Sequence, residues 1–138
     1  MKLFLVRAAL AAGVSASAPA AAVADSCWTH NGSLMRLIAQ GASRRLVYEQ
    51  PRAGIEAAGG RPGVVLFEGA RTGDRYEGTA RIFNEASCPG SPPLVYRVSG
   101  FAGDREIVLT GARNVFENCE PTGATRTDRL VFTYSHQC

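Results

Sequence analysis

The chain has 138 residues, of which 46% are hydrophobic, and 15 lysines and arginines oppose 12 aspartates and glutamates. This length suits one domain rather than two. The small net charge of +3 argues against nucleic acid as a partner, since that needs a concentrated basic surface. Four cysteines in so short a chain favour a disulfide-bonded protein of a non-reducing compartment.

Residues 1–24 have the pattern of a removable secretory signal. Lys2 and Arg7 give a positive start, an alanine-rich apolar stretch follows, and Ala22–Ala24 matches the small-x-small cleavage site. The stretch is too short to serve as a stable membrane-spanning anchor. We therefore expect a periplasmic or secreted protein that begins at Asp25 and has no transmembrane segment after cleavage. The mature chain would carry 13 arginines, no lysine and 12 carboxylates, so part of the basic charge belongs to the signal.

Short runs of alternating hydrophobic and polar residues follow, separated by Gly, Pro, Asn and Asp. Such period-two patterning predicts antiparallel strands. The expected strands cover Ser33–Ala39, Ser43–Gln50, Val64–Glu68, Tyr76–Phe83, Leu94–Val98, Ile107–Leu109, the surroundings of Phe116 and Leu130–Tyr134. Seven or eight strands favour an all-β domain over residues 25–138, a small closed antiparallel barrel, because closure removes exposed strand edges. A two-sheet sandwich is the alternative.

Two connections stand out between these strands. Pro51–Gly63 is rich in glycine and proline and is expected to form a long loop over the sheet. Within it, Gly54–Gly59 is the one stretch with helical character, and glycines bound it too closely to predict a helix. Cys88–Pro93 (Cys-Pro-Gly-Ser-Pro-Pro) predicts a second, rigid connection.

The four cysteines are expected to form two disulfides, Cys27–Cys138 and Cys88–Cys119. If the first and last strands pair antiparallel, Cys27 meets Cys138, which leaves the other two as partners. The expected strand order conflicts with this pairing, because an eight-strand up-and-down count puts Cys88 and Cys119 at opposite ends of the barrel. Treating Glu106–Asn118 as one bent strand unites them but moves Cys138 away from Cys27. A long loop across one barrel end would satisfy both bridges.

Unusual residues cluster near the first cysteine, and we predict that Trp28, His30, Asn31 and, through the expected bridge, His136 share one end of the barrel. Trp28 is the only tryptophan. It is expected to close that end as a buried plug, with an exposed anchor for a ligand or partner as the alternative. Asn31 begins an Asn-Gly-Ser sequence that fits a turn, or a glycosylation sequon.

The two histidines are the candidate metal ligands. With a carboxylate such as Asp25, His30 and His136 would suit Zn²⁺ or Cu²⁺ if the bridge brought them together. Their spacing matches no metal-binding motif, so the favoured interpretation is two solvated side chains and no bound metal.

Signatures of catalysis and of cofactor binding are missing from the sequence. There is no HExxH, GxSxG, CxxC or Walker pattern, and Gly59–Gly63 lacks the Lys-Ser/Thr of a phosphate-binding loop. We therefore expect no cofactor. A hydrolase that uses either histidine with Asp128 is the enzymatic alternative. An arginine-lined anion site would need several arginines to converge, which scattered positions such as Arg36, Arg61 and Arg113 do not indicate.

Four segments of the chain carry a resemblance to known sequences: Cys27–Leu37, Pro51–Gly54, Leu66–Gly69 and Tyr76–Ala80. They are similar to a group of small exported proteins of alphaproteobacteria, over most of the mature chain. The resemblance implies export and a bacterial source but no mechanism, because that group has no assigned activity. The exported lysozyme-inhibitor barrels are of similar size and contain disulfides, but their Ser-Gly-x-x-Tyr motif is not found in this chain, and Thr72–Tyr76 is only loosely similar to it.

The sequence thus predicts a non-catalytic periplasmic or secreted domain that binds an envelope protein or a small ligand. A small exported hydrolase, an inhibitor-like protein and a purely structural envelope protein are the alternatives.

Overall fold

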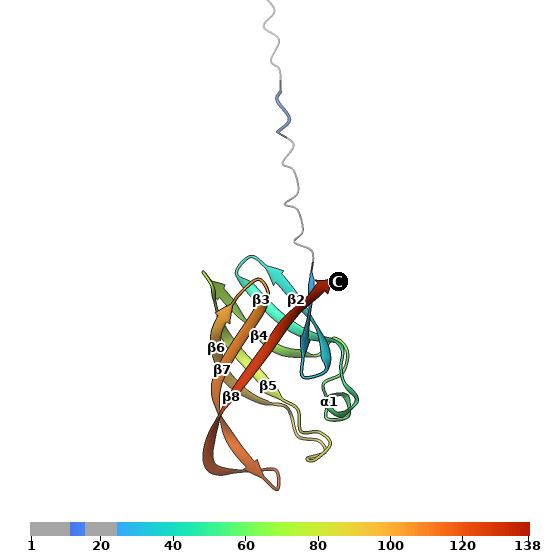
Figure 1. Cartoon of the computed structure of the whole chain (residues 1–138), viewed down its shortest axis with the longest axis vertical. Coiled ribbons are helices and arrows are strands. Elements are labelled where there is room, and N and C mark those ends of the chain that lie inside the picture. Colours follow the sequence, from blue (N-terminus) through green and yellow to red (C-terminus); the bar gives the residue numbers. More distant parts are fainter. Residues whose placement is uncertain (1–11, 16–24) are drawn as a thin grey trace, which may run out of the picture.

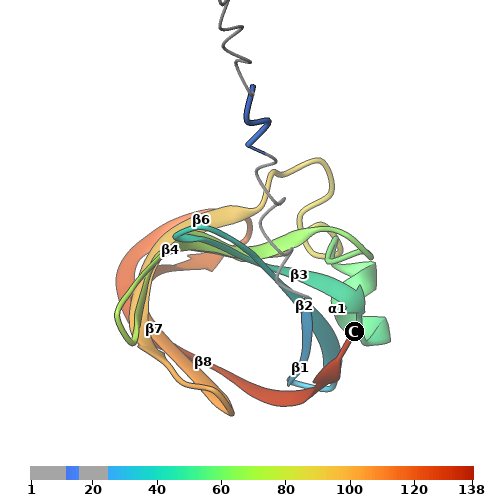
Figure 2. The same cartoon turned by 90° about the horizontal axis from the view of Figure 1, so that it is seen from above.

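The computed structural model describes residues 12–15 and 25–138; the rest of the expected signal peptide, residues 1–24, lies outside the described residues. Eight antiparallel strands follow one another around a closed barrel, and β8 pairs with β1 to close it (Figures 1 and 2). The strands are β1 (Ser26–His30), β2 (Ser33–Gln40), β3 (Ser43–Gln50), β4 (Val65–Thr72), β5 (Arg75–Ile82), β6 (Leu94–Ala102), β7 (Glu106–Glu117) and β8 (Glu120–Gln137). The predicted barrel is confirmed, and the sandwich alternative is wrong.

Side chains alternate between the interior and the exterior along each strand, as the hydrophobic pattern predicts. The largest fully buried side chains from the alternating apolar positions are Met35, Leu46, Phe67, Ile107, Leu109 and Phe132. The barrel is therefore filled by its own side chains in the middle, and any hollow for a ligand lies towards its ends or its wall.

Two glycines let neighbouring strands approach closely. Gly69 on β4 pairs with Gly78 on β5. A Cβ atom at either position would lie 2.1 Å from a carbonyl oxygen of the facing strand. Glycine is therefore required at both positions, because any side chain there would collide with the facing backbone.

The short helix α1 (Ala53–Ala57) lies in the β3–β4 connection, beside the barrel in Figure 2, in the segment where the sequence predicted only a loop. Ile55 and Phe83 pack against the buried core, and Tyr48 meets the Phe83 ring edge to face at 5.8 Å. The helix is five residues long. A single turn has little stability of its own, so this packing rather than helical periodicity holds it. Within the described residues no helix is long and apolar enough to cross a membrane.

Both predicted disulfides form, with Cα–Cα distances of 5.3 Å for Cys27–Cys138 and 5.7 Å for Cys88–Cys119. The expected conflict with an up-and-down barrel was wrong, and no crossing loop is needed. The sequence reading missed β1, whose five residues are cut short by a tight turn, and split β7 into two strands. With the correct count, the β5–β6 and β7–β8 connections lie at one barrel end and both termini at the other.

Strands β7 and β8 extend beyond the barrel as a two-stranded ribbon (Figure 1). β8 pairs with β1 only along its last residues, and β6 pairs with β7 only from Ser99 to Ala102. Leu94–Val98 of β6 therefore faces Gly111–Glu117 of β7 without a continuous ladder. We call this interruption in the barrel wall the β6–β7 seam.

Candidate functional site

Trp28 lies inside the barrel near the end that carries the termini. Only 4% of its surface is exposed, and its ring meets Tyr134 edge to face at 5.6 Å. The indole N–H donates to the Ser26 hydroxyl at 2.8 Å, so its one polar group is satisfied. This is the packing of the expected plug, although the side chain also borders a small hollow at that end.

His30 lies at the opposite end of β1 and is 7% exposed. Its ring stacks on Phe132 with 4.4 Å between centroids, and Nδ1 lies 2.8 Å from the Val131 carbonyl oxygen. Since that oxygen only accepts, Nδ1 carries the proton. Nε2 lies 3.4 Å from the Asn31 amide nitrogen, which donates to it, so Nε2 is unprotonated and the ring is neutral. Burial, partly offset by the hydrogen bond to Val131, lowers the pKa of His30 below 6.5.

Asn31 forms a turn rather than a binding surface. Asn31 and Gly32 have φ values of 45° and 80° between the paired residues His30 and Ser33. Positive φ at both central residues is what a two-residue type I′ hairpin requires, and Asn-Gly is the favoured sequence for it.

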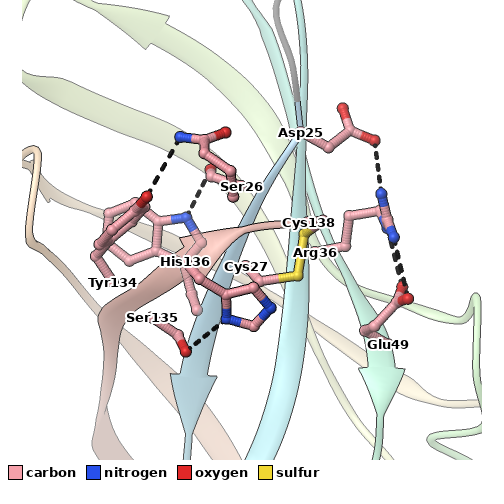
Figure 3. The surroundings of a disulfide bond; sticks show 11 residues. Asp25, Ser26, Cys27, Arg36, Glu49, Tyr134, Ser135, His136 and Cys138 are labelled. Atoms are coloured by element: carbon pink, nitrogen blue, oxygen red, sulfur yellow. Dashed lines mark hydrogen bonds and ion pairs between the residues drawn. A yellow bond between two sulfur atoms is a disulfide. The ribbon is translucent and has the colours of Figure 1, made fainter.

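His136 lies beside the terminal disulfide, where it pairs with Cys27 (Figure 3). It is exposed, and its Nδ1 lies 2.8 Å from the Ser135 hydroxyl. On the other side of the disulfide, Arg36 donates two hydrogen bonds to Glu49 and one to Asp25. Asp25 is thus engaged by an arginine rather than turned to a histidine.

The four predicted site residues do not gather at one barrel end, which corrects that expectation. β1 runs from the terminal end, where Trp28 and His136 lie, to the other end, where His30 and Asn31 lie. The prediction failed because it treated this segment as a lead-in to the first strand. Within residues 25–138 neither imidazole hydrogen-bonds to a carboxylate. Among the described residues no three His, Cys, Asp or Glu side chains gather into a metal-binding group.

The largest described hollow lies instead in the β6–β7 seam. It has a volume of about 390 Å³, within the range of ligand pockets. Consecutive residues line it on both sides, Leu94–Arg97 from β6 and Ala112–Asn114 from β7, with Phe116 beyond them. A pocket lined by consecutive strand residues runs along the strand edges, since one face alone would present every second residue.

Polar groups converge beside this pocket. Asp128 on β8 accepts a hydrogen bond from the Tyr96 hydroxyl at 3.2 Å and lies 2.6 Å from Nε of Arg113. Nε of Arg126 lies 3.7 Å from the same carboxylate. The Arg113 Nε–H is not aimed at the carboxylate and has no hydrogen-bond partner within the described structure. Burial and the neighbouring Asp128 charge raise the pKa of Tyr96 to about 12, so this hydroxyl keeps its proton.

Sequence reasoning found single members of this cluster but not the cluster. Arg113 was grouped with Arg36 and Arg61, which lie elsewhere and pair with other carboxylates. The available signal was the alternation along β8. Arg126 and Asp128 are two residues apart and share a face, and Arg126 pairs across the ladder with Arg113. Reading that signal required β7 to be recognised as one continuous strand.

The fold and the pocket define a small, all-β, disulfide-linked barrel with an interrupted wall. No protein-family model, curated protein or solved structure matches the chain, so the geometry alone carries the functional argument.

Proposed function

We propose that this chain is a non-catalytic binding domain of the periplasm or the extracellular space, and that it holds an extended segment of a partner protein in the β6–β7 seam. The observation that carries the proposal is the interrupted ladder. β6 pairs with β5 along Leu94–Phe101, but with β7 only along Ser99–Ala102. From Leu94 to Tyr96 one edge of β6 thus faces a pocket instead of a ladder, whereas the Arg97 carbonyl oxygen lies against Gly111 of β7, where a Cβ atom would come within 2.0 Å of it.

Backbone groups on this edge are suited to strand addition. The Gly103 N–H donates to the Glu106 oxygen, so alternate residues of β6, counted back from Gly103, direct N–H and C=O groups towards β7. Continued past the end of the ladder, the alternation assigns Val95 and Arg97 to that side. The Arg97 carbonyl already lies against Gly111 of β7, so Val95 supplies the open backbone groups. An extended peptide can pair with such an edge through its own backbone.

The side chains around the edge favour a segment with apolar and acidic residues. Val95 is 61% exposed and lines the pocket, so it offers an apolar contact to a segment that lies there. Arg97 is exposed, lines the pocket and forms no salt bridge within residues 25–138. An arginine without a carboxylate, beside an exposed apolar side chain, matches an acidic partner residue next to an apolar one.

The two disulfides support the proposed location in the periplasm or the extracellular space. Both bridges close in the fold, and Cys119 and Cys138 are exposed to solvent. Exposed cystines of this kind persist where thiols are not kept reduced, as in the periplasm or outside the cell.

Site-specific photo-cross-linking tests the proposal. A photoreactive residue is placed at Val95, and as a matched control at Phe101, which is 50% exposed on the same strand but pairs with Val108 in the intact ladder. We expect a protein adduct in envelope material from Val95 alone, and its loss in Arg97→Glu. Equal adducts from both positions, or an adduct that survives Arg97→Glu, would contradict the seam as the binding surface.

A further inference from the structure

A second hollow lies at the barrel end that carries the termini, away from the seam. It has a volume of about 220 Å³ and opens where the β2–β3, β4–β5 and β6–β7 turns meet, at the end viewed in Figure 2. We call it the barrel mouth. Its principal lining side chains are Trp28, Leu37, Arg44, Arg71, Tyr76 and Tyr134. Barrel mouths are common places for small-molecule sites.

The inner part of the mouth is aromatic and fixed in position. Trp28 meets Tyr134 edge to face, and Tyr76 is stacked on Phe67 with 5.9 Å between centroids. Because the Trp28 N–H is already bonded to Ser26, its ring offers an apolar surface rather than a polar group. Rigid aromatic walls favour a flat apolar ligand at a low entropic cost.

Two arginines, Arg44 and Arg71, line the same hollow as these aromatic side chains. One NH group of Arg44 donates to the carbonyls of Gly41 and Ser43, and Nε of Arg71 donates to the carbonyl of Gly73. These bonds hold each guanidinium against its own hairpin turn and leave further N–H groups free. Both side chains are partly buried, so the remaining donors are less hydrated than on an open surface.

Neither arginine has a carboxylate partner within residues 25–138, whereas three of the four other partly buried arginines, Arg36, Arg81 and Arg113 but not Arg45, have one. Asp104 is the one acidic side chain of the lining, and it forms no salt bridge within the described residues. Arg105 lies next to the mouth, 5.2 Å from the centre of the Tyr134 ring. Two or three positive charges thus face one negative charge, which favours an anion.

We propose that the barrel mouth binds a small organic anion with a flat apolar body, of the class of aromatic carboxylates. The carboxylate takes charge-assisted hydrogen bonds from Arg44 and Arg71, whose planar forks match its two oxygens. The ring of the ligand lies against Trp28 and Tyr134. The volume suits a single ring and excludes a nucleotide or a long lipid.

The only tryptophan of the chain borders the site, so its fluorescence reports on the mouth alone. The oxidised protein is titrated with benzoate, with its neutral isostere benzamide and with inorganic phosphate, and calorimetry gives an independent reading. We expect a saturable response to benzoate at concentrations up to the order of 10 mM, and binding of benzamide at least about tenfold weaker, since the charge is lost. Phosphate is expected to bind more weakly than benzoate, because it lacks the ring.

Substitutions then locate the site. Arg44→Gln and Arg71→Gln should each weaken benzoate about tenfold, and Asp104→Asn should strengthen it. Arg129→Gln, at an exposed arginine of β8 that lines neither hollow, is the matched control and should leave benzoate binding unchanged. Thermal melting of each variant separates lost binding from lost folding. Benzamide binding as tightly as benzoate, no saturable response, or equal losses from Arg129→Gln would overturn the proposal. None of these results bears on partner capture at the seam, so the two proposals fail separately.

Discussion

A buried neutral histidine makes the stability of this barrel depend on pH. In the folded state the pKa of His30 is lowered from 6.5, chiefly by burial, whereas the unfolded chain has an ordinary histidine. Between the lowered pKa of the folded state and 6.5, the unfolded state therefore binds a proton that the folded state does not. The stabilisation is fully present above the unfolded pKa and is lost as the pH falls through the lower, folded value.

We predict that the melting temperature falls between pH 7 and pH 5, and that part of this fall disappears in His30→Asn. Asparagine keeps a donor near the position of Nδ1 for the Val131 carbonyl but does not titrate. His136→Asn is the control, because His136 is exposed and lies at the other end of β1. Parallel pH profiles for wild type and His30→Asn would show that another group causes the acid sensitivity.

Trp28 should behave as part of the core as well as a wall of the mouth. Its side chain is 4% exposed and packs against Tyr134, so Trp28→Ala removes a large buried aromatic. We expect a loss of about 3–5 kcal/mol in the free energy of unfolding, measured by denaturant titration. Trp28→Phe should cost clearly less, because it leaves a smaller cavity. A Trp28→Ala variant as stable as wild type would refute the plug.

At the scale of elements, the β7–β8 ribbon depends on the Cys88–Cys119 bridge. Beyond the point where β7 no longer pairs with β6 and β8 no longer pairs with β1, the ribbon is paired only with itself. Asn118 and Cys119 form its tip with φ values of 51° and 65°, a conformation that costs energy in residues other than glycine. The bridge ties this tip to the β5–β6 connection and so joins the two walls of the seam.

Replacing Cys88 and Cys119 together by serine should loosen the ribbon while the barrel stays closed. The bridge spans 31 residues, for which the chain-entropy estimate is about 3–4 kcal/mol. Hydrogen exchange should rise within Ala112–Arg126 and change little around Leu109 and Phe132, which are fully buried. Uniform loss of protection across all strands would instead show that the bridge stabilises the fold as a whole.

At the scale of the whole molecule, the barrel architecture could be predicted from the sequence, but the two candidate sites could not. Alternation and turn residues predicted the barrel, because a half-buried strand must place every second residue inside. β1 was missed since Cys27–His30 contains polar residues that tertiary packing buries, His30 above all. The helix α1 was missed since it depends on the packing of Ile55 against the core, most of which comes from residues remote in sequence, such as Phe83.

The seam and the barrel mouth depend on where the pairing between neighbouring strands ends. The alternation of hydrophobic and polar residues along a single strand does not show where that is. Leu94–Val98 looks the same in a sequence whether or not β7 lies beside it. Likewise Arg44 and Arg71 lie 27 positions apart and meet only because β3 and β4 pair from Ser43 and Ala70 onward. Long-range register therefore decides the candidate sites, and residue type alone does not.

Closure of the barrel gives the expected signal cleavage a structural test. β1 begins at Ser26, which pairs with Gln137, and the Cys138 N–H donates to the Asp25 carbonyl at 3.2 Å. Asp25 also forms a salt bridge with Arg36. Removal of residues 1–24 would therefore leave every one of these closing contacts intact, whereas cleavage two residues further on would remove Asp25 and Ser26.

We predict that the exported protein begins at Asp25 with all four cysteines oxidised. Intact-mass analysis of periplasmic or secreted material should give the mass of residues 25–138 less four hydrogen atoms, and non-reducing peptide mapping should recover Cys27–Cys138. A control chain that begins at Cys27 should melt at a lower temperature, because it lacks the Asp25 and Ser26 contacts. A mature mass that retains residues 1–24, carries a lipid or includes free thiols would contradict the prediction.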